Sequence, residues 1–193
     1  MRFELKRLQR ELKITTVYVT HDQSEALALS HQVAVMNLGR IQQIGSPRDI
    51  YERQQNKFVA DFVGTTNFVE GTVIAKDVEN GFYVIDTEFG ALHSYSVEAV
   101  RVGDKVVLSI RPEDVELTEV EPANTNVNVW RAQVELKVFL GEALDFRIKV
   151  GNRTLLARAH PSVRTPVGQQ LWVHIHPDKS VAMPLTEELR SAA

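Results

Sequence analysis

A histidine stands at a predicted strand-to-helix junction near the start of the chain. Within residues 15–20, threonine or tyrosine at 16, 18 and 20 alternates with valine at 17 and 19, which predicts a β-strand that delivers His21 at its end. Asp22, with Glu25 three residues later, predicts a helix N-cap with a reciprocal acidic partner directly afterwards. In α/β proteins ligand chemistry is placed where a strand runs into a helix, so His21 is the first candidate functional residue.

A second group of polar residues surrounds a proline in the middle of the chain. Arg111, Glu113 and Asp114 flank Pro112 at the end of a predicted strand. Proline cannot donate to a strand ladder, so Arg111 can fix a bend there by pairing with a carboxylate. The same residues can instead form a small-molecule or partner-sensing contact between the two halves of the domain. The sequence leaves both interpretations open.

Two histidines near the end of the chain have a spacing that metal ligands can use. His174 and His176 share one face of a predicted strand with Trp172. The chain has no cysteine and shows no evident third ligand, and a structural zinc site needs four. We therefore expect a polar outer face here and no metal site.

The elements that would position His21 follow helical and hairpin patterns up to residue 64. Apolar residues recur at helical spacing in two segments, and a serine before a proline marks a helix start. A glycine between two short apolar runs predicts a hairpin turn. The predicted elements are a helix at 1–12, a hairpin of 33–36 and 41–44 turning at Gly39, a helix start at Ser46-Pro47, and a helical stripe at 58–63.

After residue 65 the hydrophobic period changes from helical to alternating. Eight short strands punctuated by glycines are predicted, which is typical of a small barrel such as the OB-fold. The predicted strands are 68–76, 82–87, 91–96, 105–111, 130–139, 144–150, 154–159 and 170–176.

Composition excludes several classes of protein. The chain of 193 residues is long enough for one or two domains, and its hydrophobic content of 44% can form a core in each. The net charge of −3 argues against nucleic-acid binding, and the lack of cysteine fits a reducing compartment. No secretory signal and no apolar run of bilayer length is found. We expect a cytoplasmic protein that reaches a membrane only through a partner.

Residues 1–64 resemble the C-terminal end of an ABC transporter ATPase of the importer subfamily that carries a C-terminal β-barrel domain. The resemblance implies that this segment is an α/β remnant of the ATPase domain and that His21 is the switch histidine, which contacts the γ-phosphate of ATP. It also implies ATP and magnesium as cofactors of the full-length family. The resemblance rests on residues 5–9, 16–23, 25–27, 33–37, 39–41, 44–47, 50–52 and 58–64.

Residues 65–185 resemble the transport-associated OB-fold domain, called TOBE, and residues 186–193 are expected to be a tail. The segments that carry this resemblance are 109–117, 138–141 and the strands that end near 176–178. The resemblance implies ABC permease subunits as partners, a homodimer formed through the TOBE domains, and a location on the inner face of the membrane. It indicates the polyamine, ferric iron or sugar importer group, and the sugar-importing branch is the least similar of these.

Parts of the catalytic machinery of that family are missing from the sequence. There is no phosphate loop of the form G-x-x-x-x-G-K-[ST], no signature motif and no magnesium-binding carboxylate pair. This pattern is expected of a truncated product, an incorrectly assigned start or the tail of a split gene. We predict that the chain alone neither binds ATP tightly nor hydrolyses it. The alternative is a non-catalytic regulatory or small-molecule-binding module that contacts other transporter subunits.

The resemblance also has a consequence for solubility. In the family, residues 1–64 lean on a larger parallel sheet, so Val17, Val19, Val33 and Val35 are expected to lack part of their cover. We therefore predict exposed hydrophobic surface and self-association in solution.

Overall fold

The computed structural model describes residues 2–123 and 127–185. The chain forms two compact units, Met1–Gly64 and Thr65–Ala193. The predicted tail at 186–193 lies outside the described residues.

The first unit contains four helices and one hairpin. The amphipathic helix predicted at the start is confirmed as α1, and the helix start at Ser46 is confirmed because its side chain accepts a hydrogen bond from the Asp49 amide. Asn56 caps the next helix in the same way. The elements are α1 (Arg2–Leu12), α2 (Gln23–Leu29), β1 (Val33–Asn37), β2 (Arg40–Gly45), α3 (Pro47–Glu52) and α4 (Lys57–Phe62).

The predicted hairpin is confirmed, and it carries one side of a small core. Leu38 and Gly39 both have positive φ, 47° and 76°, as a two-residue turn of the primed type requires. Val35 of this hairpin, which was expected to lack part of its cover, is instead buried in a cluster with Ile50, Val59 and Val63.

The strand predicted at 15–20 is wrong for this structure. Residues 13–20 form neither strand nor helix, and Val17 and Val19 are 88% and 90% exposed. A β-strand needs a neighbour that satisfies its N–H and C=O groups, and the described residues provide none for this segment. The only strand pair described in the first unit is the antiparallel β1–β2 hairpin, so the expected α/β character is not seen there.

The second unit is all-β, and all eight predicted strands are present. Two further strands, β7 and β12, were not predicted; each follows a short 3-10 turn that begins with proline. The elements are β3 (Asn67–Lys76), β4 (Tyr83–Thr87), β5 (Gly90–Ser96), β6 (Lys105–Ile110), η1 (Pro112–Asp114), β7 (Val115–Thr118), β8 (Val129–Phe139), β9 (Leu144–Val150), β10 (Arg153–Ala159), β11 (Gln170–Ile175), η2 (Pro177–Lys179) and β12 (Ser180–Pro184).

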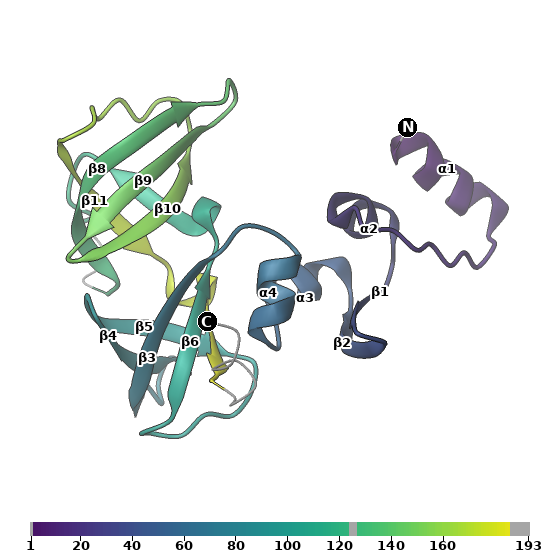
Figure 1. Ribbon diagram of the computed structural model, residues 1–193, viewed down its shortest axis with the longest axis horizontal. Helices are drawn as coiled ribbons and strands as arrows, with labels where there is room; N and C mark the ends of the chain where they lie inside the picture. The colour runs from purple at the N-terminus through teal and green to yellow at the C-terminus, as the bar shows by residue number, and fades with distance from the viewer. Residues whose placement is uncertain (1, 124–126, 186–193) are drawn as a thin grey trace. The chain divides into compact units, whose positions relative to one another are not determined.

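These strands form a closed barrel and a five-stranded sheet. The barrel has the order β12-β5-β4-β3-β6, and the sheet has the order β10-β9-β8-β11-β7. Figure 1 shows β8 to β11 grouped together and β3 to β6 forming a second group, with the yellow C-terminal strand beside β6. The predicted OB-like barrel is therefore confirmed, and a second sheet accompanies it.

The order of elements repeats within this unit. Four strands, a 3-10 turn and a fifth strand occur in a first half, residues 67–118, and again in a second half, residues 128–184. The fifth strands are exchanged: β7 of the first half pairs with β11, and β12 of the second half pairs with β6 and β5. Each sheet is thus completed by the other half of the chain.

Two buried asparagines join the halves in the same way. The Asn67 side chain accepts from the Leu156 amide (2.7 Å) and donates to the Leu156 carbonyl (2.9 Å). The Asn128 side chain does the same with the amide (2.7 Å) and the carbonyl (2.8 Å) of His93. Each amide also donates to the carbonyl that ends the fourth strand of its own half, Ile110 or Ile175. One core of aliphatic residues with Tyr83 and Phe146 runs through both sheets.

Candidate functional site

His21 lies on a bend between the irregular segment and α2, and its side chain is exposed. Asp22 begins the helix as predicted, because its Oδ1 accepts from the Glu25 amide at 3.1 Å. The reciprocal half of the predicted capping box is not formed. Instead, the Asp22 amide donates to the Thr20 hydroxyl at 2.9 Å. No described side chain hydrogen bonds to the His21 imidazole.

The Glu25 side chain, which does not complete the capping box, bonds to the segment that leads into His21. Its Oε2 accepts from the Tyr18 hydroxyl at 2.8 Å and from the Thr20 hydroxyl at 3.3 Å. The hydrogen bond to Glu25 raises the pKa of Tyr18 above its usual value, so the phenol stays protonated as the donor. These contacts hold both sides of His21, and the sequence analysis missed them. The available signal was a tyrosine and a threonine on the same predicted face, close to the acidic N3 residue.

The group around Pro112 occupies a 3-10 turn between β6 and β7. Arg111 is buried, and one of its guanidinium nitrogens donates to the Thr65 carbonyl at 3.1 Å. Glu113 is exposed, and Asp114 lies 3.8 Å from the ammonium of Lys179. The turn therefore contacts the start of the second unit and the corresponding turn η2.

The two histidines at the end of β11 each face a carboxylate. Nδ1 of His174 lies 2.9 Å from Glu116 on β7, and Nδ1 of His176 lies 2.5 Å from Asp178 on η2. The two ring centroids are 6.0 Å apart. Within residues 2–123 and 127–185, no group of three or more histidine, cysteine or acidic side chains is arranged to hold a metal ion.

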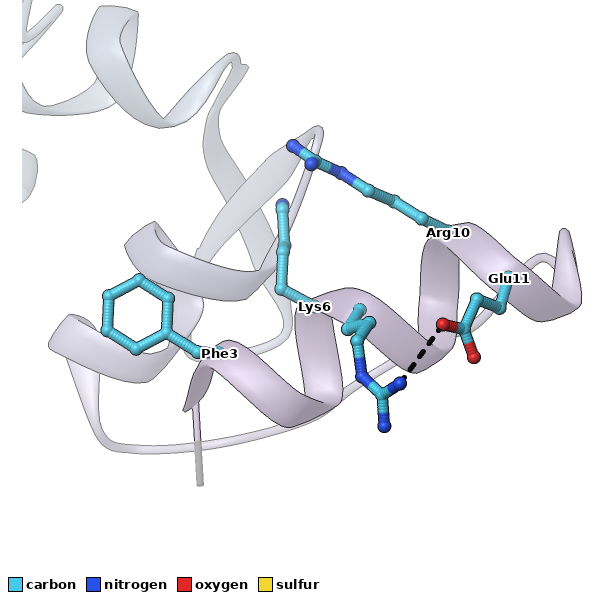
Figure 2. Close-up of a pocket in the computed structure, with 5 residues that line it drawn as sticks. Phe3, Lys6, Arg10 and Glu11 are labelled. Atoms are coloured by element: carbon cyan, nitrogen blue, oxygen red, sulfur yellow. Dashed lines mark hydrogen bonds and ion pairs between the residues drawn. The ribbon is translucent and has the colours of Figure 1, made fainter.

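A shallow pocket of about 440 Å³ lies beside α1 in the first unit. Figure 2 shows its lining side chains spreading from this one helix, with Lys6 and Arg10 extending to one side. Lys6 donates to the Leu29 carbonyl at 2.8 Å, and Arg7 pairs with Glu4 and Glu11. Lys6 therefore joins α1 to the end of α2, the pairs of Arg7 lie within α1, and none of the predicted site residues lines the pocket.

The described residues do not make a complete nucleotide site. His21 contributes one exposed imidazole, and no acidic cluster that could hold magnesium accompanies it in the part of the chain that the structure describes. ATP with magnesium needs several loops that position the phosphates and the metal ion. The residues present therefore fit only one part of such a site.

None of the described helices is long and apolar enough to span a bilayer.

Comparison with known proteins identifies relatives over most of the chain. Residues 108–183 match the TOBE domain family. The spermidine/putrescine import ATP-binding protein PotA 1 of Pseudomonas aeruginosa is 40% identical over 168 residues, which are 87% of this chain and 43% of that protein. The spermidine/putrescine import ATP-binding protein PotA of Thermobifida fusca is 37% identical over 190 residues, covering 95% of this chain and 48% of the relative. The chain thus spans about half the length of these relatives.

A solved structure shares the fold of part of the chain. The cytoplasmic molybdate-binding protein ModG superposes with a TM-score of 0.51 at 14% identity, covering 60% of this chain and 94% of that protein. At this identity the similarity shows the fold alone.

Proposed function

We propose that the chain belongs to the ATP-binding subunits of ABC importers that carry a TOBE domain and that it works in an ATP-driven polyamine importer. In this proposal it supplies the last nucleotide-facing residue of the subunit, His21, together with the TOBE unit. The observation that carries the proposal is the 37% identity to a polyamine import subunit over 190 residues, which include both compact units.

The role of His21 is to contact the γ-phosphate once the remaining loops of an ATPase domain are present. Its position between a held segment and a capped helix supports this, because the Glu25 contacts and the Asp22 cap fix the backbone on both sides while the imidazole stays exposed. Residues 1–64 are the C-terminal part of that ATPase domain in this proposal. The uncovered valines at 17 and 19 are then the positions that the rest of the α/β sheet would cover.

The partners follow from the same proposal. The subunit engages ABC permease subunits at the inner face of the membrane and remains cytoplasmic, and two copies associate through their TOBE units. Residues 65–185 form that TOBE unit. Polyamine is the proposed transported solute because the relatives named above are spermidine/putrescine import proteins.

A chimera tests the transport role. The part of the Pseudomonas aeruginosa relative that this chain does not match would be fused to this chain and expressed in a strain lacking its own subunit. We expect spermidine uptake to be restored, to be lost in His21→Ala, and to be retained in the control His160→Ala, an exposed histidine in the turn after β10. A chimera that assembles with the permeases but restores no uptake contradicts the proposal.

The chain by itself is proposed to lack ATPase activity. Phosphoryl transfer depends on positioned phosphate-binding groups and magnesium, and one imidazole does not supply them. Purified chain should release no phosphate from Mg·ATP above the buffer rate in a coupled assay. Magnesium-dependent turnover that disappears in His21→Ala would show that the proposal is wrong.

A non-catalytic regulatory module is the second candidate. It is favoured by the β unit, which has its own continuous core, while the segment leading to His21 is uncovered. In this case, the chain would act by contacting other transporter subunits or a small molecule around Arg111, Glu113 and Asp114. Arg111→Met, which removes the contact with Thr65, would then change regulation of uptake by the chimera without changing its maximal rate.

A further inference from the structure

The pair of histidines beside the end of β11, which the sequence led us to expect as a polar face without a metal, has no role in the function proposed above. We propose that His174 and His176 form a surface site for one divalent transition-metal ion such as Zn²⁺, bound through their two Nε2 atoms with water completing the coordination. Glu116 and Asp178 serve as the outer partners that orient the two imidazoles.

The hydrogen bonds of His174 and His176 fix the tautomer that leaves Nε2 available to a metal ion. An ionised carboxylate can only accept hydrogen bonds, so the contacts of Nδ1 with Glu116 (2.9 Å) and Asp178 (2.5 Å) place the proton of each neutral ring on Nδ1. The lone pair of each neutral imidazole then lies on Nε2. Histidines that bind metals commonly donate their other ring N–H to a carboxylate in this way, which orients the ring and raises its basicity.

The spacing of the two imidazole rings fits a shared metal ion. Zinc binds histidine nitrogen at about 2.0–2.1 Å, so two imidazoles that share one ion place their centroids about 5–6 Å apart. The measured separation is 6.0 Å, with the ring planes at 74°. The His174 side chain is only 12% exposed and held by β7, whereas that of His176 is 60% exposed. One ligand is therefore fixed and the other is accessible to solvent.

The negative charge around the two histidines favours a bound cation. The two carboxylates offset the charge of a divalent ion, and the cations of the adjoining turn and of the paired strand β8 have other partners. Lys179 lies 3.8 Å from Asp114, and the guanidinium of Arg131 stacks on Trp172 with its carbon 4.3 Å from the ring centroid. Only two protein nitrogens are available, so the site is expected to be weaker than a structural zinc site with four ligands.

Titration of the full chain, without a polyhistidine tag, with ZnCl₂ tests the proposal. Calorimetry should show one saturable equivalent, and the ring signals of His174 and His176 should shift first in ¹H–¹³C spectra. His176→Ala should weaken binding at least tenfold, and because this side chain is exposed we expect the variant to fold. Asp178→Asn should weaken binding about tenfold while leaving both nitrogen ligands in place.

The matched control is His160→Ala, which removes an exposed histidine whose Nδ1 contacts Ser162 rather than a carboxylate. This variant should bind zinc like the original chain. A second readout is the thermal midpoint of unfolding, which should rise with zinc in the original chain and in His160→Ala but not in His176→Ala. Absence of a saturable equivalent, or equal affinity in His176→Ala, overturns the proposal.

Discussion

Asn67 and Asn128 each use the side-chain amide to bond to the backbone of a residue that is distant in the chain. Their side-chain amides accept from a backbone N–H and donate to a backbone C=O of the same partner residue, as a neighbouring strand would. Both are buried, so these hydrogen bonds do not compete with water. Asn128 adopts a positive φ of 54°, which asparagine tolerates better than most residues. The two side chains therefore act as joints between the halves of the β unit.

Replacing either asparagine should destabilise the β unit strongly. Asn67→Ala leaves the N–H and C=O of Leu156 without these partners inside the protein, and we expect a loss of about 2–4 kcal/mol in the free energy of unfolding. Asn128→Ala should cost a similar amount because it leaves the N–H and C=O of His93 without these partners. Denaturant unfolding measures both values. Asn152→Ala, at an exposed turn position, is the control and should change stability by less than about 0.5 kcal/mol.

Acid stability should depend in part on the pair of Asp145 and Arg158. Arg158 donates two hydrogen bonds to this carboxylate, at 2.7 and 3.0 Å, and lowers the pKa of Asp145. A carboxyl group with a lowered folded pKa contributes stability above its unfolded value, about pH 4, and that contribution is lost as the pH falls through the folded value. Both side chains are partly exposed, so the effect is below about 1 kcal/mol.

The measurement is urea unfolding at neutral pH and at about pH 3. Arg158→Met should reduce the difference in stability between the two conditions, and Arg164→Met, at an exposed arginine, should leave it unchanged. An unaltered difference in Arg158→Met would show that the pair does not couple folding to protons.

Sequence patterns identified the helix caps at this scale and missed the distant contacts. The caps at Asp22 and Ser46 were predicted because each side chain bonds to an amide three residues away. The roles of Asn67 and Asn128 were not predicted, since their partners lie 89 and 35 residues away in the chain. The Glu116 partner of His174 was missed for a related reason, because Glu116 reaches His174 only after β7 pairs with β11.

Among the elements, the segment at 13–20 departs most from its sequence pattern. Alternating β-branched and aromatic residues have a high strand propensity, but propensity reflects packing against neighbours on a sheet. Without a neighbour, the segment leaves Ile14, Val17 and Val19 largely exposed. The apolar side chains that would lie inside a sheet then form a surface that can associate with other molecules.

Self-association should therefore depend on this segment. The double variant Val17→Lys/Val19→Lys should shift sedimentation of concentrated chain toward the monomer and leave the thermal midpoint unchanged. The matched control Val102→Lys/Val120→Lys, at two valines exposed in the β unit, should leave the association in place. Backbone amides at 15–20 should also exchange rapidly with deuterium. A monodisperse original chain with protected amides there contradicts the prediction.

Strands were predicted from the sequence where one face is buried and the other is not, as in β9, whose buried residues alternate with exposed or half-buried ones. The two missed strands lack this signal. In β12, four successive residues are buried and a proline ends the strand, and β7 has only four residues after a turn. Continuous burial gives no period of two, so such strands are hard to separate from loops in the sequence.

For the whole molecule, the exchange of fifth strands makes the two halves of the β unit depend on each other. The barrel contains β12 from the second half, and the other sheet contains β7 from the first. The core is also continuous between them. This arrangement was not predicted, because the repeat of elements is clear in the strand order but weak in the residue types.

Neither half should fold alone. Pieces covering 65–125 and 126–185 each lack one strand of their own sheet and one asparagine joint, so each should be largely unfolded by circular dichroism and amide spectra. Mixing them in equal amounts should restore dispersed amide signals. A monomeric piece that unfolds cooperatively by itself would contradict this expectation.

The place of β12 also has a consequence for synthesis. Its residues, Ser180–Pro184, fill the gap between β5 and β6, which are made about 70 or more residues earlier. While the ribosome is still producing the second half, the nascent first barrel stays open along that seam. Chaperones can reach it during this interval, and a premature stop codon anywhere before β12 leaves the earlier barrel unfinished.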